Sequence, residues 1–256
     1  MRLLVASIFF LLGQATTQSH SDGSGTLELS NLYPDSNLFI PNRAEWQITA
    51  YKKRIKDFRK DPIGHNKIVF LGNSITQGGK DWNGKFEVSN IMNRGITGDI
   101  TESMLARLEE IYYYKPLKVF LLIGINDIFD GVIPYSPEIT SEKVANNIYN
   151  IADSIKSHSQ NTEIFIYTLL PVDEQKFKKV RGFYPKHNYP LEKQINEINQ
   201  KIFDLGKDRE YQTIDLFSLF IDDNNKIKLE LFKDGLHLNE SGYKAWTDHI
   251  ENFVKF

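Results

Sequence analysis

Four short polar segments, far apart along the chain, carry the residue types that acyl transfer requires. Ser74 offers a hydroxyl nucleophile, and His237 offers a general base with Asp234 three residues before it. Gly98 and Asn126 offer N–H groups that can stabilise an oxyanion. A nucleophile, a base, a group that orients the base and donors for negative charge are the parts of an acyl-transfer site. The set therefore predicts a serine hydrolase. The segments span residues 72–76, 93–99, 124–127 and 234–237.

Each of these residues also has an ordinary structural explanation. A serine after a strand can cap the next helix, and a glycine in a loop can supply a positive φ. Asn126 can bond its own loop, and Asp234 with His237 can form a surface turn before the last helix. The presence of all the parts in one chain favours catalysis over these separate explanations.

The length and composition are those of a soluble globular protein. The 256 residues are 41% hydrophobic and 25% charged, which suits one domain with a full core. The net charge of −2 gives no electrostatic basis for binding nucleic acid or an anionic membrane. The absence of cysteine excludes disulfides, thiolate zinc sites and thiol nucleophiles. No histidine pair has metal-ligand spacing, so we expect neither a metal nor a cofactor.

The N-terminus has the pattern of a signal peptide. Arg2 precedes an uncharged apolar run over residues 3–12, and small polar residues follow the run. This run is too short to span a bilayer. We therefore expect residues 1–20 to be a cleaved signal peptide and the mature protein to be secreted or periplasmic, without stable membrane insertion. A buried N-terminal helix is the alternative. Residues 21–43 would then form an N-terminal extension, and residues 44–256 the hydrolase domain.

Apolar strand patterns alternate with amphipathic helix patterns along the rest of the chain. The run at 119–123 is apolar throughout, as expected of a strand that is covered on both faces. The alternation predicts an α/β fold, a three-layer αβα sandwich around a parallel sheet. The five predicted strands lie at 67–71, 89–92, 119–123, 163–169 and 211–214. The predicted helices lie at 44–59, 104–112, 144–155 and 191–205, and after Asn239.

A strand order of 2-1-3-4-5 would bring the chemistry-bearing segments together. Ser74, Gly98 and Asn126 follow the first, second and third predicted strands. In a doubly wound sheet of that order the first and third strands are neighbours, and ligands bind at the switch point between them. We therefore expect the three residues to face one cleft at the carboxyl edge of the sheet.

The chain resembles the SGNH hydrolases, a branch of the GDSL esterases and lipases, from about residue 67 to residue 253. Residues 68–79, 95–99 and 234–242 are most similar to the platelet-activating-factor acetylhydrolase-like and sialate O-acetylesterase-like members. Asn73 departs from the pattern, because many members have aspartate there, but this position is not in the triad. The resemblance implies an esterase with a flavodoxin-like sandwich, and it leaves the ester open.

By this resemblance Ser74 is the nucleophile, His237 is the base and Asp234 is the partner of the base. The backbone N–H groups of Ser74 and Gly98 and the side-chain amide of Asn126 form the oxyanion hole. The resemblance implies no cofactor and no metal.

The sequence favours a short acyl ester, above all an acetyl ester, on a carbohydrate. No long apolar stripe is left for a lipid chain, and the segment at 171–190 is rich in polar and aromatic residues. Trp82, Phe183 and Tyr184 are the side chains that we expect to contact substrate, because aromatic rings suit sugar faces. A solvated surface insertion is the alternative for the segment at 171–190.

Two other functions stay open. One is an esterase for short-chain phospholipid or other lipid esters. The other is a catalytically silent module that binds an acylated glycan. In each case the expected partner is a small-molecule or glycan ester and not a nucleic acid, and the oligomeric state is left open.

Overall fold

The central sheet is parallel throughout, with strand order β2-β1-β3-β4-β5, which confirms the predicted order and the α/β fold. The computed structural model describes residues 29–35, 37–129, 138–187, 189–209 and 211–255. The predicted signal peptide lies outside these residues. The strands are β1 (Ile68–Gly72), β2 (Ile91–Gly95), β3 (Lys118–Leu122), β4 (Glu163–Tyr167) and β5 (Gln212–Ile214).

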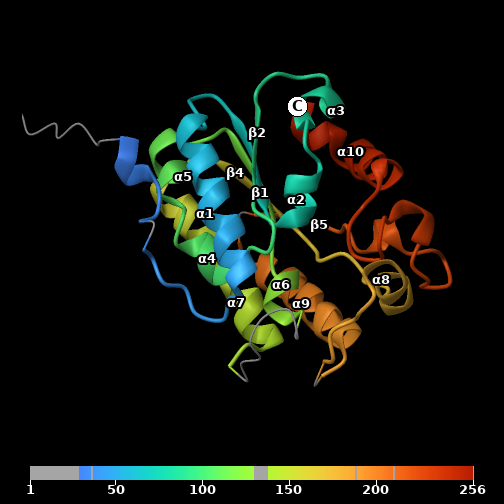
Figure 1. The fold of residues 1–256 in the computed structure, drawn as a ribbon. Coiled ribbons are helices and arrows are strands. Elements are labelled where there is room, and N and C mark those ends of the chain that lie inside the picture. The colour runs from blue at the N-terminus through green and yellow to red at the C-terminus, as the bar shows by residue number, and fades with distance from the viewer. Residues whose placement is uncertain (1–28, 36, 130–137, 188, 210, 256) are drawn as a thin grey trace, which may run out of the picture.

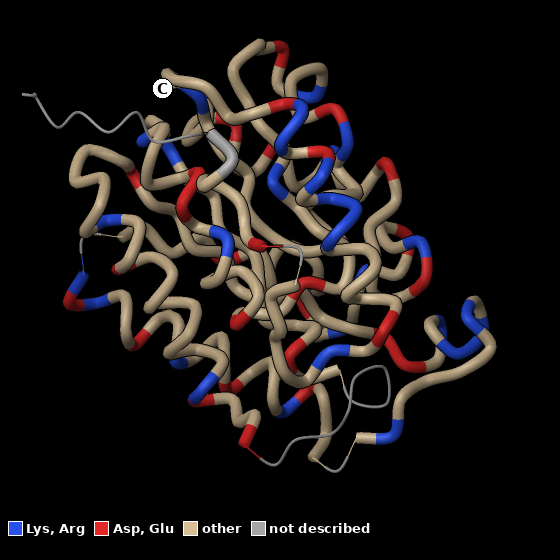
Figure 2. Tube along the Cα trace, turned by 60° about the vertical axis from the view of Figure 1, so that its left-hand side comes forward, with Lys and Arg blue, Asp and Glu red and all other residues tan. Residues whose placement is uncertain are grey.

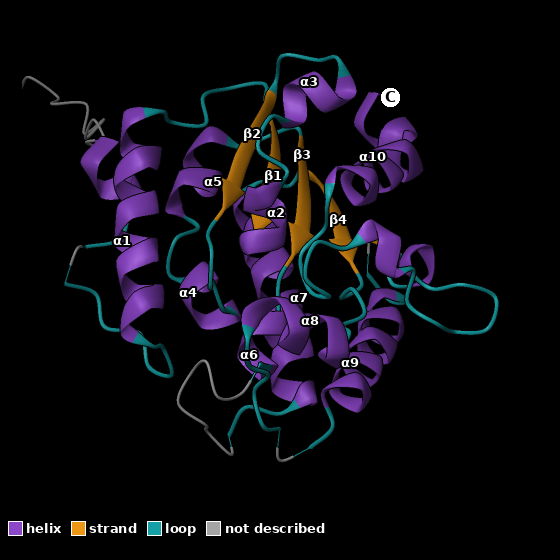
Figure 3. Cartoon of the chain, turned by 45° about the vertical axis from the view of Figure 1, so that its right-hand side comes forward, coloured by secondary structure: helices purple, strands orange, loops and turns teal. Residues whose placement is uncertain are grey.

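Helices surround this sheet. The α-helices are α1 (Glu45–Lys60), α2 (Ser74–Gly78), α3 (Trp82–Phe86), α4 (Thr101–Leu105), α5 (Glu109–Tyr114), α6 (Ile125–Ile128), α7 (Ser141–His158), α8 (Glu174–Arg181), α9 (Leu191–Gly206) and α10 (Glu240–Lys255). Short 3₁₀ helices are η1 (Leu29–Leu32), η2 (Ser218–Phe220) and η3 (Leu229–Leu231). α5, α7 and α9 cover one face of the sheet, and α3 and α10 pack together on the other (Figures 1 and 3). The three-layer sandwich expected from the sequence is therefore present.

Aromatic rings stacked across neighbouring strands form the centre of the core. Phe70 of β1 is in register with Phe120 of β3, and Phe120 is in register with Phe165 of β4. Their ring centroids are 4.9 and 4.5 Å apart, and all three side chains are buried. Stacked pairs of this kind contribute about 0.5–1.5 kcal/mol each beyond the burial of their area. The row gives a rigid base to the strands that precede the predicted site residues.

Three elements differ from the sequence prediction. β2 extends beyond its predicted end, because the charged side chain of Arg94 is buried within the strand. The helix predicted at 104–112 is divided into α4 and α5, where Arg107 turns its guanidinium inward to the ends of the strands. The segment at 171–190 contains α8, which Asp173 caps by accepting a hydrogen bond from a backbone N–H of its first turn at 2.6 Å.

Arg94 and Glu110 form an ion pair inside the protein, with side chains only 3% and 5% exposed. Two parallel hydrogen bonds of 2.9 Å join the guanidinium to the carboxylate. The hydroxyl of Tyr33 and the backbone N–H of Ile63 also donate to this carboxylate, at 2.8 and 2.9 Å. Glu110 therefore ties α5 to β2 and to the segment before α1. Elsewhere, charged residues of both signs are spread over the chain (Figure 2).

Replacing Glu110 with alanine is expected to lower the free energy of unfolding by about 3–5 kcal/mol, because Arg94 would stay buried without its partner. Urea denaturation measures this change. Glu109→Ala is the matched control, because Glu109 is the exposed neighbour in the same helix. That control should change stability by less than about 0.5 kcal/mol. Equal losses in the two variants would contradict the buried pair.

Candidate active site

Ser74 is the first residue of α2, and a single residue, Asn73, links it to the end of β1. Asn73 caps this helix, because its side chain accepts a hydrogen bond from the backbone N–H of Ile75 at 2.9 Å. Ser74 is therefore not the cap, and its hydroxyl is available for another partner. Gly95 allows the helix to lie close to the sheet, since a Cβ at this position would be 2.2 Å from the backbone nitrogen of Gln77.

The hydroxyl of Ser74 contacts His237. Ser74 Oγ lies 3.0 Å from Nε2 of His237. On the other side of the imidazole ring, Nδ1 lies 3.2 and 3.0 Å from the two carboxylate oxygens of Asp234. The carboxylate accepts the Nδ1 proton, which leaves Nε2 as an acceptor for the serine hydroxyl. The structure thus brings these residues into the geometry of a catalytic triad, while their catalytic roles stay predictions.

The carboxylate of Asp234 is fully buried and accepts several hydrogen bonds. The backbone N–H groups of Leu236 and His237 donate to Oδ1 at 3.2 and 2.7 Å. Arg181, the last residue of α8, donates to Oδ2 through Nε at 2.7 Å and through Nη2. Burial alone would raise the pKa of Asp234, but the bonds from His237 and Arg181 hold this pKa below its usual range. Asp234 is therefore ionised at neutral pH, as the orientation of His237 requires.

Gly98 and Asn126 line the same cleft as Ser74. Gly98 has a φ of +76°, and a Cβ at this position would be 2.7 Å from the ring of Trp46, so only glycine fits. Nδ2 of Asn126 donates a hydrogen bond of 2.9 Å to the carbonyl of Asp99. This bond fixes the amide and leaves its second N–H for a ligand. The cleft therefore gathers the N–H donors that an oxyanion hole needs.

Asp99 and Arg107 form a buried ion pair beneath these donors. Arg107 donates to one carboxylate oxygen of Asp99 through Nε and Nη2, at 2.9 and 2.8 Å. Nη2 of Arg107 also donates to the carbonyls of Gly72 and Arg94, at the ends of β1 and β2. The pair fixes the loop after β2 relative to both strands. Sequence reasoning missed Arg107, because a lone arginine in an amphipathic helix pattern gives no signal of burial.

Asp127 anchors the loop that carries Asn126. Its buried carboxylate accepts hydrogen bonds from the backbone N–H of Thr101 at 3.1 Å and from the Thr101 hydroxyl at 2.5 Å. Burial raises the pKa of Asp127 to about 7; the bonds from Thr101 act in the opposite direction, and the nearby charge of Asp99 adds to the rise. The loop is thus held by a carboxyl group that titrates near neutral pH.

The predicted site residues Ser74, Gly98, Asn126 and His237 line one cleft of about 780 Å³. Phe183 also lines this cleft and is 50% exposed, so it is placed where a substrate contact was predicted. Trp46 of α1 lines it as well and is 44% exposed. Trp46 could not be recognised as a cleft residue from the sequence, because α1 lies well before the first motif.

Two of the three aromatic residues expected to contact substrate do not line the cleft. The prediction for Trp82 is wrong: its ring is buried, stacks on Phe70 at 4.5 Å and donates a hydrogen bond of 3.1 Å to the backbone carbonyl of Thr76 in α2. Tyr184 is half-buried and packs against Phe129 and Phe177, two residues of the cleft lining. Trp82 and Tyr184 therefore pack against residues of the site and do not line the cleft themselves.

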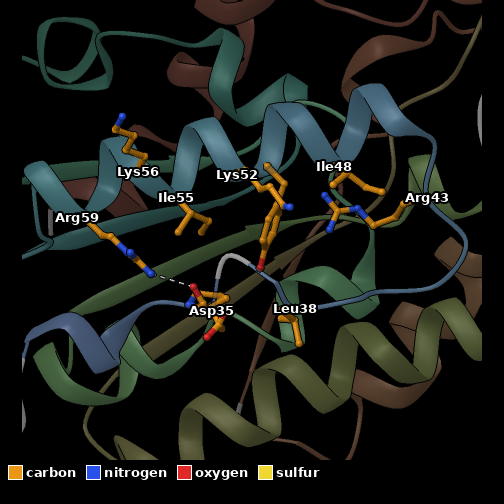
Figure 4. Close-up of a pocket in the computed structure, with 10 residues that line it drawn as sticks. Asp35, Leu38, Arg43, Ile48, Lys52, Ile55, Lys56 and Arg59 are labelled. Atoms are coloured by element: carbon orange, nitrogen blue, oxygen red, sulfur yellow. Dashed lines mark hydrogen bonds between the residues drawn. The ribbon is translucent and has the colours of Figure 1, made fainter.

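A second, smaller hollow of about 280 Å³ lies between α1 and the segment before it (Figure 4). Arg59 borders this hollow and donates a hydrogen bond of 2.9 Å to the carbonyl of Pro34. None of the predicted catalytic residues line it. In the part of the chain that the structure describes, no group of three or more acidic or histidine side chains could hold a metal ion. No helix among the same residues is long and apolar enough to cross a membrane.

Known proteins match the chain over the region that carries this cleft. Residues 70–245 match the GDSL-like lipase/acylhydrolase family. The chain belongs to this family. The GDSL match confirms the predicted SGNH relationship and makes the protein a carboxylic ester hydrolase by family.

Individual GDSL relatives agree with this assignment. The chain is 28% identical over 182 residues to the rat platelet-activating factor acetylhydrolase IB subunit alpha2, across 69% of this chain and 70% of that protein. A structure from Streptococcus pneumonia described as a platelet activating factor has a TM-score of 0.68 at 26% identity, across 82% of this chain and 94% of that one. A GDSL-like lipase from Bacteroides thetaiotaomicron shares the fold, with a TM-score of 0.64 at 21% identity across 80% and 97%.

Ser74→Ala and His237→Ala are each expected to lower kcat for p-nitrophenyl acetate by on the order of 10⁶, and the double variant should be no slower than either. The reason is that nucleophile and base act as one unit. Ser241→Ala, at an exposed serine of α10, is the matched control and should keep full activity. A fluorophosphonate probe should label the wild type at Ser74. A folded Ser74→Ala protein that keeps more than a few per cent of activity would reject the assignment.

Asp127 is expected to make stability depend on pH. Its folded-state pKa of about 7 lies above that of an unfolded aspartate, so its contribution is full below about pH 4 and is lost as pH rises through about 7. Asp127→Asn removes this titration. The difference in unfolding free energy between wild type and variant should therefore shift in favour of the variant, by on the order of 4 kcal/mol, between pH 4 and pH 8. A difference that is the same at both pH values, measured by urea denaturation, would show that Asp127 titrates normally.

Proposed function

We propose that the protein is a secreted serine esterase that removes short acyl groups, above all acetyl groups, from carbohydrate esters. One observation carries the esterase part: Ser74 Oγ lies 3.0 Å from His237 Nε2, with Asp234 on the far side of the ring. A serine and a histidine that are hydrogen-bonded in a cleft are an activated nucleophile and its base. Export is proposed from the apolar run at residues 3–12.

The proposed reaction has two steps. His237 takes the proton of Ser74 as the serine oxygen attacks the ester carbonyl, and the oxyanion that forms is stabilised by the N–H groups of Ser74, Gly98 and Asn126. The imidazolium, stabilised by Asp234, gives its proton to the leaving alcohol, and an acyl-enzyme remains on Ser74. His237 then deprotonates a water molecule that attacks the acyl-enzyme, and the proton returns to the serine as the acid leaves.

The lining of the cleft supports a carbohydrate ester. Trp46 and Phe183 present exposed rings, and polar side chains, among them Gln77, line the same cleft. Ligand sites combine apolar surface with a few polar groups that fix orientation, and a sugar offers both a flat face and hydroxyls. The name of the rat relative, an acetylhydrolase, supports acetyl as the acyl group that is transferred to Ser74.

An acetylhydrolase for short-chain phospholipid esters is the second candidate, and the same relative favours it. Against it, Trp46 and Phe183 are the only strongly exposed large apolar side chains in the cleft lining among the described residues. The apolar part of a lipid would need more exposed apolar surface than these two rings provide. A silent binding module is the third candidate, and hydrolysis of p-nitrophenyl acetate would separate it from both esterases.

Acetyl and propionyl esters are expected to be hydrolysed far faster than octanoyl or longer esters, because only two large apolar side chains of the described cleft lining, Trp46 and Phe183, are strongly exposed. The measurement is kcat/KM across a series of p-nitrophenyl esters of increasing acyl length. A maximum at eight or more carbons would overturn the short-acyl proposal and favour a lipase.

A further inference from the structure

The charges around the active-site cleft do not balance, although the whole chain has a net charge of −2. Glu240 is the one acidic residue among the described residues of the lining, and it is paired with Lys85 at 2.9 Å. Arg181 lines the cleft as well, and buried Asp234 neutralises it. Lys80 and Lys233 remain, and neither has an ion pair within the described parts of the chain. The cleft therefore presents two positive charges that the acidic residues offset only in part, because Glu240 is paired with Lys85 and attracts Lys80 from further away.

Both lysines belong to segments that carry the triad. Lys80 is exposed and follows shortly after α2, whose first residue is Ser74. Lys233 is exposed and precedes Asp234, and its backbone N–H donates to the carbonyl of His237 at 2.7 Å. A negative group on a bound substrate would therefore meet these charges while its ester lies at Ser74.

Arg181 offers a further donor to such a group. Its bonds to Asp234 use Nε and Nη2, and Nη2 also lies 3.4 Å from Nδ1 of His237. Neither bond uses Nη1. Since the side chain is 43% exposed and lines the cleft, Nη1 is placed to bond an oxygen of the substrate, separated from Ser74 by one imidazole ring.

We propose, resting on the esterase function above, that the natural substrate is an acidic glycan: an acetylated sugar with a carboxylate on the same or the adjoining ring. Lys80 and Lys233 select it by charge, and Trp46 and Phe183 contact its sugar faces. Charges of one sign that line a cleft concentrate ligands of the other sign. A zwitterionic phospholipid headgroup fits less well, because its quaternary ammonium would meet the same two lysines.

The test compares kcat/KM for an O-acetylated methyl glucuronoside with that for the O-acetylated methyl glucoside, which has a hydroxymethyl group in place of the carboxylate. An exposed ion pair contributes a factor of about 2–5, so two lysines should give about a tenfold preference for the glucuronoside at low salt. The preference should fall toward one in Lys80→Gln/Lys233→Gln, and in 0.5 M salt, where exposed charges are screened.

Lys115→Gln is the matched control. Lys80 and Lys115 are both exposed and both have a left-handed backbone, with φ of 53° and 48°, but Lys115 precedes β3 at the opposite edge of the sheet. This variant should keep the full preference. The single variants Lys80→Gln and Lys233→Gln, each with a smaller loss, serve if the double variant does not fold.

The outcomes separate this proposal from the esterase assignment. Equal rates on the two glycosides, with p-nitrophenyl acetate still hydrolysed, would overturn the acidic substrate and leave the esterase intact. A preference that survives in the double variant, or falls equally in Lys115→Gln, would overturn the role of the two lysines. Faster hydrolysis of acetylated glycerophosphocholine than of the glucuronoside would replace the acidic glycan with a phospholipid. Failure to hydrolyse any acetyl ester would reject the esterase itself.

Discussion

At the carboxyl edge of β1 and β2, the guanidinium of Arg107 donates hydrogen bonds to one backbone carbonyl of each strand. Asp99 neutralises the charge of this guanidinium. A guanidinium stays charged when it is buried, and its planar fork holds several acceptors at fixed angles. Asp99 extends this arrangement to the site. Gly98 precedes Asp99 in the chain, and the backbone carbonyl of Asp99 accepts a hydrogen bond from the side-chain amide of Asn126. Breaking the pair would leave a charge buried without its partner and would remove one anchor of the loop that carries Gly98, so this contact links the stability of the fold to the geometry of the proposed site.

This arrangement means that the donors are in position before any substrate binds. Donors that are already oriented need no reorganisation as charge develops on the substrate, which is why such groups are effective in catalysis. Arg181 plays a comparable part on the other side of the cleft, where it joins α8 to the carboxylate of Asp234. The site is thus supported by two buried carboxylates, Asp99 and Asp234, which are held by Arg107 of the turn between α4 and α5 and by Arg181 of α8.

The sequence was sufficient for the features that follow from topology. A parallel sheet places the carboxyl ends of all its strands at one edge, so Ser74, Gly98 and Asn126 could be brought together from strand order alone. Arg107 and Arg181 could not be predicted, because whether an arginine is buried depends on the partner that tertiary packing brings to it. Arg181 and Asp234 are 53 residues apart in the chain.

The aromatic residues also show that the sequence did not predict which side chains tertiary packing buries and which it leaves in the cleft. Trp82 is close to Ser74 in sequence, but its ring is directed into the layer between β1 and α10, where Phe70 and Trp246 pack on it. Trp46 is far from Ser74 in sequence, and α1 brings it to the cleft. The distance of an aromatic residue from Ser74 along the chain therefore does not predict whether its ring lines the cleft. That depends on how the helices pack on the sheet.

At the start of α2, one residue caps the helix and the next residue is the proposed nucleophile. Asn73 satisfies the start of the helix, so the side chain of Ser74 has no part in holding it. A gene copy that loses this serine would still encode a folded protein with an intact cleft, charged rim and exposed rings. Loss of the proposed nucleophile and loss of the folded cleft are therefore separate events in this protein, because the cap of α2 depends on Asn73 alone among the two residues.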